Sequence, residues 1–405
     1  MTSEINWLEG GTITSPKGFT AGATYSGIRT YTEDKLDLGI VCSESVCTVA
    51  GTFTKNAVKS PSVVLDQQRV ATGRAQAVVI NSGIANACVG EQGMTDAIEM
   101  AALAAAKLGL EAELVLACST GLIGVELPMG LIRSGTDKIE MHEDGGHELA
   151  RAICTTDLVS KEAAVSFEVD GVTYTLGGIA KGSGMIHPNM ATMLAFLATD
   201  APVDGAYLQT SLSRSVDCSF NMISVDGDSS TNDTVLLLAN GAAGGSAIDA
   251  SSPGADAFQA ALDAVCADLA KAIARDGEGA SKLIEVVVEN AMNESDARVA
   301  ALSVASSMLV KSAIHGADPN WGRIIVALGY SGAQVKEELV ALYINDVCIM
   351  EGGRPIPYFK DAVVLSMSGT DVSLRLNLGL GDASATAWGC DLSEEYVTFN
   401  SAYTT

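Results

Sequence analysis

The sequence is poor in basic and in aromatic residues. Its 405 residues include 24 lysines and arginines against 49 aspartates and glutamates, a formal net charge of −25, and aromatic residues make up only 5%. Because such a charge is repelled by phosphate backbones and by anionic lipid surfaces, nucleic-acid and membrane partners are not expected. Low-complexity segments, internal repeats and blocks of like charge are also missing, which argues against a disordered or a repeat protein.

Metal-binding patterns and membrane-spanning stretches are lacking as well. The four histidines, His142, His147, His187 and His315, show no zinc spacing, so we expect no metal site. No apolar run is long enough to span a bilayer, and the first residues lack the basic region and apolar core of a signal peptide. Nine cysteines, an odd number, fall partly in apolar runs and are expected to be reduced thiols. These features predict a soluble, cytoplasmic protein.

The sequence does contain regular alternation of strand-like and helix-like segments. Short β-rich runs such as 114–120 and 362–368 are separated by helical patterns such as 256–273 and 295–314. This alternation predicts an α/β or α+β fold in which helices cover the sheets, with parallel and antiparallel pairing left open. A chain of this length exceeds the size of a single core, so we expect two intimately packed halves.

The most informative segment is 181–201, in which a glycine-rich turn and a proline precede Thr192. The apolar run 193–198 predicts a buried strand that begins directly after this threonine. A threonine at the start of a strand is ordinarily just a β-former. Alternatively, the Ala191–Thr192 bond is cut and Thr192 becomes a new N-terminus, whose α-amine, titrating near roughly pH 8, is the base for its own hydroxyl. The local residues alone leave both interpretations open.

This segment resembles the cleavage and nucleophile region of the ornithine acetyltransferase family, the arginine-biosynthesis enzymes also called glutamate N-acetyltransferases. The resemblance implies the fold of that family and self-cleavage into two chains, 1–191 and 192–405, that stay associated and pair into heterotetramers. Further similar segments follow in order along almost the whole chain: FTKNAVKSPSV (53–63), NSGIANACVGEQG (81–93), STGLIG (119–124), TTD (155–157), SFNMISVDGDSSTNDT (219–234), RDGEGASK (275–282), HGADPNWGR (315–323) and YVTFNSAYTT (396–405).

The resemblance assigns the reacting groups. Thr192 matches the family's nucleophile, which binds the substrate and carries the acetyl group as an ester. Thr120 and Gly121 match the oxyanion-hole pair. The expected strand 114–118 ends in a Ser-Thr-Gly turn, where a hydroxyl and a backbone N–H can point at the same oxygen, although such a turn is otherwise an ordinary strand end.

Five further residues match substrate-binding positions of the family. Lys181 suits the α-carboxylate that acetylornithine and glutamate share, and Thr155 matches a substrate-contacting threonine. Glu278 is expected to receive the cationic amine of ornithine. Asn400 and Thr405 match a pair in the C-terminal tail that reaches the pocket, so truncation beyond Asn400 is expected to damage activity. Without the resemblance, each of these side chains would be assigned to the solvated surface.

The implied reaction is a ping-pong acetyl transfer from N2-acetyl-L-ornithine to L-glutamate, which yields L-ornithine and N-acetyl-L-glutamate in the cyclic arginine pathway. No cofactor is expected. Acetyl-coenzyme A stays open as a second acetyl donor, although the glycine-rich stretches lack a dinucleotide fingerprint. Two alternatives remain: a self-processed aminopeptidase or amidase, in which water resolves the acyl-enzyme, and an uncleaved binding or scaffold protein. Ala57, Ile84 and Met222 depart from more typical family members but none is an expected chemical residue.

Overall fold

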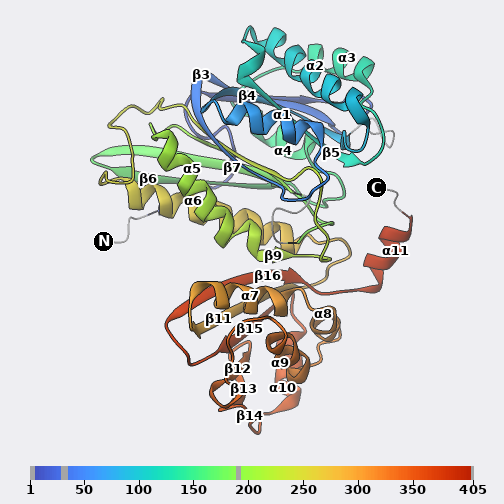
Figure 1. Ribbon diagram of the computed structural model, residues 1–405, viewed down its shortest axis with the longest axis vertical. Coiled ribbons are helices and arrows are strands. Elements are labelled where there is room, and N and C mark those ends of the chain that lie inside the picture. The colour runs from blue at the N-terminus through green and yellow to red at the C-terminus, as the bar shows by residue number, and fades with distance from the viewer. Residues whose placement is uncertain (1–4, 29–34, 188–192, 403–405) are drawn as a thin grey trace.

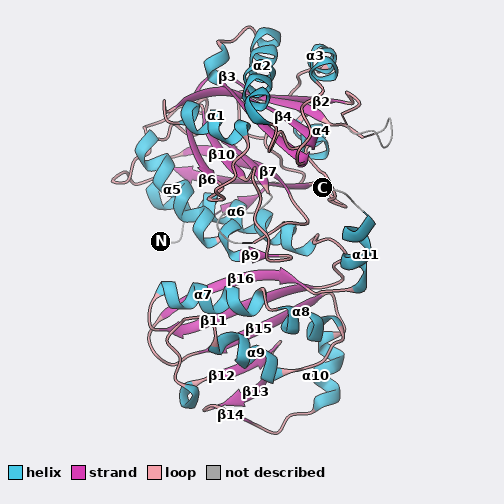
Figure 2. Ribbon diagram, turned by 45° about the vertical axis from the view of Figure 1, so that its right-hand side comes forward, coloured by secondary structure: helices cyan, strands magenta, loops and turns pink. Residues whose placement is uncertain are grey.

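The computed structural model describes residues 5–28, 35–187 and 193–402. These residues form two β-sheets, one above the other in Figure 1, and helices pack on both. The expected α/β fold with helix-covered sheets is therefore confirmed. The same arrangement is visible in Figure 2, where helices and strands have separate colours.

The first sheet has nine strands in the order β1-β6-β7-β8-β10-β3-β4-β5, with β2 paired to β3. Most neighbours are antiparallel, but β8 pairs with β10, and β4 with β5, in parallel. The strands span β1 (Ile5–Trp7), β2 (Phe19–Thr24), β3 (Leu38–Phe53), β4 (Arg74–Ile84), β5 (Val115–Leu122), β6 (Lys161–Val169), β7 (Val172–Lys181), β8 (Leu194–Thr199) and β10 (Thr234–Ala239).

The second sheet has seven strands in the order β14-β13-β12-β15-β11-β16-β9. Its inner strand β11 pairs with β15 in parallel and with β16 in antiparallel orientation. The strands span β9 (Ile223–Ser224), β11 (Leu283–Ala291), β12 (Ala341–Ile344), β13 (Val347–Glu351), β14 (Arg354–Pro355), β15 (Asp371–Asn377) and β16 (Ala383–Cys390).

Helices join the two sheets through a continuous apolar core. Helix α6 packs on β6 and β7 of the first sheet and on β9 and β16 of the second. Its Phe258 and Leu269 belong to the same buried cluster as Val286 and Leu374 of the second sheet, so the two halves are intimately packed. The helices span α1 (Pro61–Val70), α2 (Gly90–Leu108), α3 (Met129–Lys138), α4 (Gly146–Ala152), α5 (Gly205–Cys218), α6 (Ala255–Arg275), α7 (Glu294–Ala305), α8 (Met308–His315), α9 (Trp321–Gly329), α10 (Lys360–Met367) and α11 (Glu394–Ala402).

Two local expectations were wrong. The helical pattern 295–314 forms two helices, α7 and α8, bent by 54° where the Ser307 side chain caps α8 by accepting the Val310 N–H. The run 362–368 lies mostly in α10 rather than in a strand, because Val363 and Met367, four residues apart, are both buried on one helix face. Within the described residues no single helix is long and apolar enough to cross a bilayer; only the bent pair α7–α8 meets that test.

The proposed cut between 191 and 192 does not coincide with the boundary between the sheets. Strand β8 lies between β7 and β10 inside the first sheet, and β10 pairs in turn with β3. A chain 192–405 would therefore supply two inner strands to a sheet whose other members belong to 1–191. Backbone hydrogen bonds along two strand pairs, β7 with β8 and β3 with β10, together with the core, would hold the two products together without a covalent link.

Candidate active site

The predicted site residues that the structure describes converge on one cavity of about 420 Å³, which residues of both sheets' connecting loops and of α11 line. Six of them line it, although they come from five separate segments of the chain: Thr120, Gly121, Thr155, Lys181, Glu278 and Asn400. The remaining three, Ala191, Thr192 and Thr405, lie outside the described residues.

The end of β5 brings Thr120 and Gly121 to the cavity wall. Gly121 has φ +132°, and a Cβ atom there would overlap the backbone of Gly83 on the neighbouring strand β4. Glycine is required because this backbone conformation and this close approach both exclude a side chain. The pairing of β4 and β5 shifts register at Gly83 and Ile84, which turns the end of β5 out of the regular ladder. A hydroxyl and an unusual backbone segment thus lie side by side at the cavity.

Lys181 ends β7 and is 2% exposed. Its Nζ lies 3.5 Å from the Thr120 Oγ1. A buried ammonium needs compensating negative charge; Asp157 supplies part of it. Burial alone would raise the pKa of Asp157, but Lys181 and Lys161 outweigh burial and hold that pKa well below its usual value. The cavity therefore keeps a cation next to the hydroxyl of the expected oxyanion hole.

The loop after Lys181 is held on the side that leads to the expected cut. Asp226 accepts the N–H of Met185 at 2.6 Å with Oδ2 and that of Ile186 at 2.9 Å with Oδ1. Met185 has φ +56°, a left-handed conformation that costs a non-glycine residue roughly 1 kcal/mol or more. Ser183 is fixed by the Glu278 N–H, which donates to its carbonyl at 2.8 Å. The backbone is therefore held in place as far as Ile186, two residues before the stretch 188–192, which lies outside the described residues.

The chain is also held on the downstream side of that stretch. The Asp233 Oδ1 accepts the N–H of Met193 at 3.0 Å, and the N–H of Thr54 donates to the backbone carbonyl of Asp233. Burial raises the pKa of Asp233 well above its usual range, with Lys181 acting in the opposite direction. Its Oδ2 is buried and, among the described residues, has no hydrogen-bond partner. A carboxyl whose charged form is disfavoured by burial thus binds the N–H of Met193, the residue that follows 192.

The far wall of the cavity is acidic. The Asn400 Nδ2 of α11 donates to the Glu278 Oε2 at 2.9 Å, so two residues 122 positions apart meet as expected. Gly184 allows this, because a Cβ there would overlap the Glu278 carboxylate. Asp226 and Asp228 line the same wall. Burial and the negative charge of the neighbouring Asp226 carboxylate, to which it is hydrogen-bonded, raise the pKa of Tyr396. Lys181 and this wall give the cavity both a cationic and an anionic lining.

Sequence reasoning missed several residues that shape the site. Asp157, Asp226 and Asn232 lie within segments that carried the family resemblance, but no role was assigned to them. The Asn232 Nδ2 donates to the carbonyl oxygens of Ala85 and Ser119, at 2.6 and 2.8 Å, and so joins the strand ends around Thr120. A carboxylate or amide in a loop carries no sequence signal for which distant backbone groups it will bind. Among the described residues, no group of three or more His, Cys, Asp or Glu side chains is placed to hold a metal ion.

Comparison with known proteins identifies the family of the chain. A family model described as the ArgJ family matches residues 20–405. The chain belongs to the ArgJ family. It is 50% identical to the arginine biosynthesis bifunctional protein ArgJ of Symbiobacterium thermophilum, over 99% of this chain and 100% of that protein. It is 43% identical to the protein of the same name from Bacillus subtilis, over 98% of this chain and 97% of that one.

A solved ArgJ structure resembles part of the chain. The arginine biosynthesis bifunctional protein ArgJ of Bacillus halodurans is 43% identical, with a TM-score of 0.51. The match covers 98% of that solved chain but 51% of this one. The expected resemblance to the ornithine acetyltransferase family is thereby confirmed at the level of the ArgJ family, whose model reaches from β2 past α11.

Proposed function

We propose that this chain, an ArgJ-family acetyltransferase of arginine biosynthesis, transfers the acetyl group of N2-acetyl-L-ornithine to L-glutamate through an ester on Thr192. The observation that carries the proposal is the meeting of six predicted site residues, from five segments, at one cavity. Asp226 and Asp233 fix the backbone on either side of 188–192 at the same place. Relatives named bifunctional support acetyl-coenzyme A as a second acetyl donor.

The first event is cleavage of the precursor. The Thr192 hydroxyl attacks the Ala191 carbonyl carbon, the peptide nitrogen leaves as the Thr192 α-amine, and an ester joins Ala191 to the Thr192 Oγ. Water then hydrolyses the ester, which frees the Ala191 carboxylate and the Thr192 hydroxyl. The solved relative matches about half of this chain, as a piece left by a mid-chain cut would. Fixed ends at Ile186 and Met193 would hold the bond in position for this attack.

Acetyl transfer uses the same threonine. The Thr192 α-amine takes the proton of its own hydroxyl, and the Oγ attacks the acetyl carbonyl of acetylornithine. The negative charge that develops on the carbonyl oxygen is stabilised by the Thr120 hydroxyl and the Gly121 N–H, with the Lys181 ammonium adjacent. The proton passes to the amine of ornithine as the C–N bond breaks. Glutamate then attacks the ester with its own amine, and the steps run in reverse.

The charges of the cavity fit acetylornithine. Acetylornithine carries an α-carboxylate and a side-chain ammonium, so it can place negative charge near Lys181 and positive charge near Glu278. Thr155, the last of the six residues, lines the cavity beside them. The products 1–191 and 192–405 would remain associated through the shared sheet, and pairing of such heterodimers into heterotetramers stays a prediction for a solution mass measurement.

Product analysis tests the proposal. Wild-type protein with acetylornithine should release ornithine in step with N-acetylglutamate formation, and only when glutamate is present. Thr192→Ala should be uncleaved and inactive, whereas the matched control Thr173→Ala, at an exposed position of β7, should behave like wild type. Release of acetate at an undiminished rate without glutamate would instead favour the amidase. Turnover by Thr192→Ala would show that the nucleophile lies elsewhere.

A further inference from the structure

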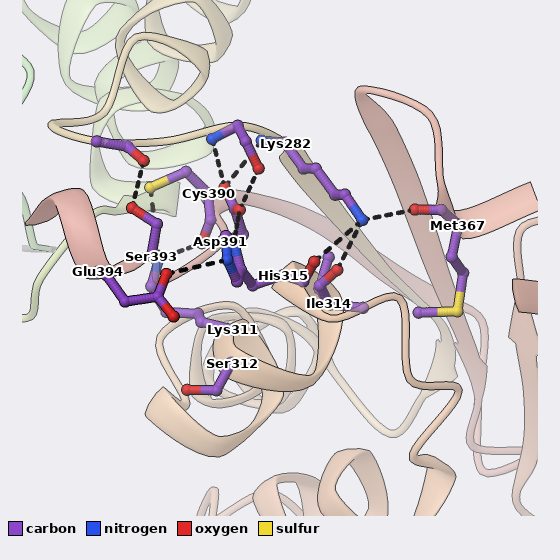
Figure 3. A network of polar contacts seen from close by, with 12 residues as sticks. Lys282, Lys311, Ser312, Ile314, His315, Met367, Cys390, Asp391, Ser393 and Glu394 are labelled. Carbon is purple, nitrogen blue, oxygen red and sulfur yellow. Dashed lines mark hydrogen bonds and ion pairs between the residues drawn. The ribbon is translucent and has the colours of Figure 1, made fainter.

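A polar network outside the cavity joins the segments that carry Glu278 and Asn400. Its centre is Asp391, which follows β16 and is 3% exposed. The Asp391 Oδ1 accepts the N–H groups of Ser281 and Lys282, both at 2.8 Å. Its Oδ2 accepts the Ser281 hydroxyl at 2.5 Å and the His315 Nδ1 at 2.7 Å (Figure 3). One carboxylate therefore receives four donors from two different parts of the chain.

The loop that carries Glu278 is bound to the segment just before α11 at further points. The Asp391 N–H donates to the Lys282 carbonyl at 3.1 Å, and the Ser393 hydroxyl donates to the Gly279 carbonyl at 2.6 Å. Gly279 has φ +69°, and a Cβ there would overlap the backbone of residue 396 in the first turn of α11. The glycine therefore lets the loop pack directly against α11.

His315 links this contact to the second sheet and its helices. It ends α8 and opens the motif HGADPNWGR, to which the proposed reaction assigns no role. Its second ring nitrogen, Nε2, lies 3.4 Å from the Glu394 Oε2 in the first turn of α11. The Lys282 ammonium donates to the carbonyls of Ile314 at 2.9 Å and Met367 at 2.8 Å, at the C-terminal ends of α8 and α10, where helix dipoles favour a cation (Figure 3).

The network ends on both sides in substrate-binding positions. Glu278 lies three residues before Ser281, and Asn400 lies in the helix that begins beside Asp391. Their side chains meet at 2.9 Å on the cavity wall, while neither His315 nor Asp391 lines the cavity. In Figures 1 and 2, α11 rises from the end of β16 towards the first sheet, away from the body of the second sheet. Besides this network, α11 is tied to the cavity wall by the hydrogen bonds of Asn400 with Glu278 and of Tyr396 with Asp226.

We propose that His315 and Asp391 are positioning residues for substrate binding: they fix the Glu278 loop against α11 and so set the affinity for acetylornithine without touching it. The inference rests on the proposed function, because it names what holds that cavity in its binding shape. A preorganised wall binds more tightly than one that must be ordered by the substrate. The Thr120–Gly121 strand end and Met193 are held outside this network, and Met185 and Ile186 are held by Asp226 rather than by Asp391. Self-cleavage and the chemical step should therefore be little affected by loss of the network.

The test is a set of substitutions at His315. His315→Ala removes both ring contacts, His315→Asn keeps a donor near the position of Nδ1, and His315→Gln keeps one nearer Nε2. The control is His147→Ala. His147 is exposed, and its Nδ1 contacts the Glu162 Oε2 at 2.8 Å. For each variant, intact mass reports self-cleavage, thermal unfolding reports folding, and initial rates give KM and kcat separately.

The expected result is complete self-cleavage in all variants, with KM for acetylornithine raised at least about tenfold in His315→Ala and kcat changed less than about threefold. His315→Asn should recover most of the affinity, and His315→Gln less, because the Asp391 contact is the one that binds the loop. Should His315→Ala not fold, the comparison of KM between His315→Asn and His315→Gln still tests the inference, because only a lower KM in His315→Asn agrees with it.

Two results would overturn the inference: an unchanged KM in folded His315→Ala, or a fall in kcat with KM unaltered. An equal loss in His147→Ala would also overturn it. Failure of the proposed function is distinguishable, since wild-type protein would then form no N-acetylglutamate from acetylornithine. Wild-type turnover with unchanged KM in His315→Ala would refute only the positioning role.

Discussion

Replacing Glu278 with glutamine tests whether its carboxylate binds the side-chain ammonium of ornithine. The amide keeps the shape of the side chain and an oxygen that can still accept from the Asn400 Nδ2, now 2.9 Å from Oε2. The change removes one negative charge from the wall that Asp226 and Asp228 also line. Because the shape is kept, the perturbation is chiefly electrostatic.

The size of the effect follows from the setting of Glu278. A hydrogen bond to a charged group is worth about 1.5–3 kcal/mol, and each 1.4 kcal/mol corresponds to about tenfold in binding. Glu278 is only half-buried and Asp228 remains on the same wall, so the lower end of that range applies. We expect kcat/KM for acetylornithine to fall about 10-fold to 30-fold. For glutamate, whose side chain is itself negative, the change should be less than about threefold.

The assay measures the two half-reactions separately: ornithine release under single-turnover conditions, and loss of the acetyl adduct on addition of glutamate. Glu351→Gln, at an exposed position of β13, is the matched control for removal of one negative charge. Equal losses in both half-reactions would show that Glu278 maintains the cavity rather than selects the substrate. No loss in either would remove it from the site.

Three further predictions concern the oxyanion hole, the cut site and stability. Thr120→Val should lower kcat about 10²-fold to 10³-fold with normal folding, since it removes one oxyanion donor and keeps the branched shape; a smaller kcat effect than tenfold would exclude that role. Asp233→Ala should slow precursor cleavage at least about tenfold in a mass time course, whereas Asp233→Asn, which keeps an acceptor for the Met193 N–H, should process normally; equal processing would refute the role of this contact. Burial raises the pKa of Asp66 to about 7, so the native state keeps a proton that the unfolded chain releases near roughly pH 4. Asp66 should therefore lower the free energy of unfolding by up to about 1.4 kcal/mol per pH unit from about pH 4 to about pH 7, and urea titrations should find the fall smaller by this amount in Asp66→Asn.

The spacing of apolar residues along the sequence predicted several strands correctly. The apolar run after Thr192 is β8, buried along its whole length, and the run that ends at Thr120 is β5. The strand predicted at 362–368 was wrong, because a short apolar segment fits either a strand or a buried helix until its neighbours are known. The break between α7 and α8 was not predicted, because the serine that caps α8 does not by itself end a periodic apolar pattern.

The site was predictable to the extent that its residues lie in motifs that resemble a family. Lys181, Glu278 and Asn400 meet at the cavity as that resemblance implied. The groups that hold them were not predictable, because their partners are distant backbone atoms. Asp226 binds N–H groups about 40 positions earlier, and Asp391 binds a loop 109 positions earlier and a histidine 76 positions earlier. Only tertiary structure decides such contacts.

The most direct test of the central claim is the intact mass of purified wild-type protein before and after acetylornithine. Two masses, for 1–191 and 192–405, are expected at the start. Acetylornithine should add one acetyl group to the 192–405 chain alone, and glutamate should remove it. A single 405-residue mass in fully active protein, or an adduct on the 1–191 chain, would contradict the account.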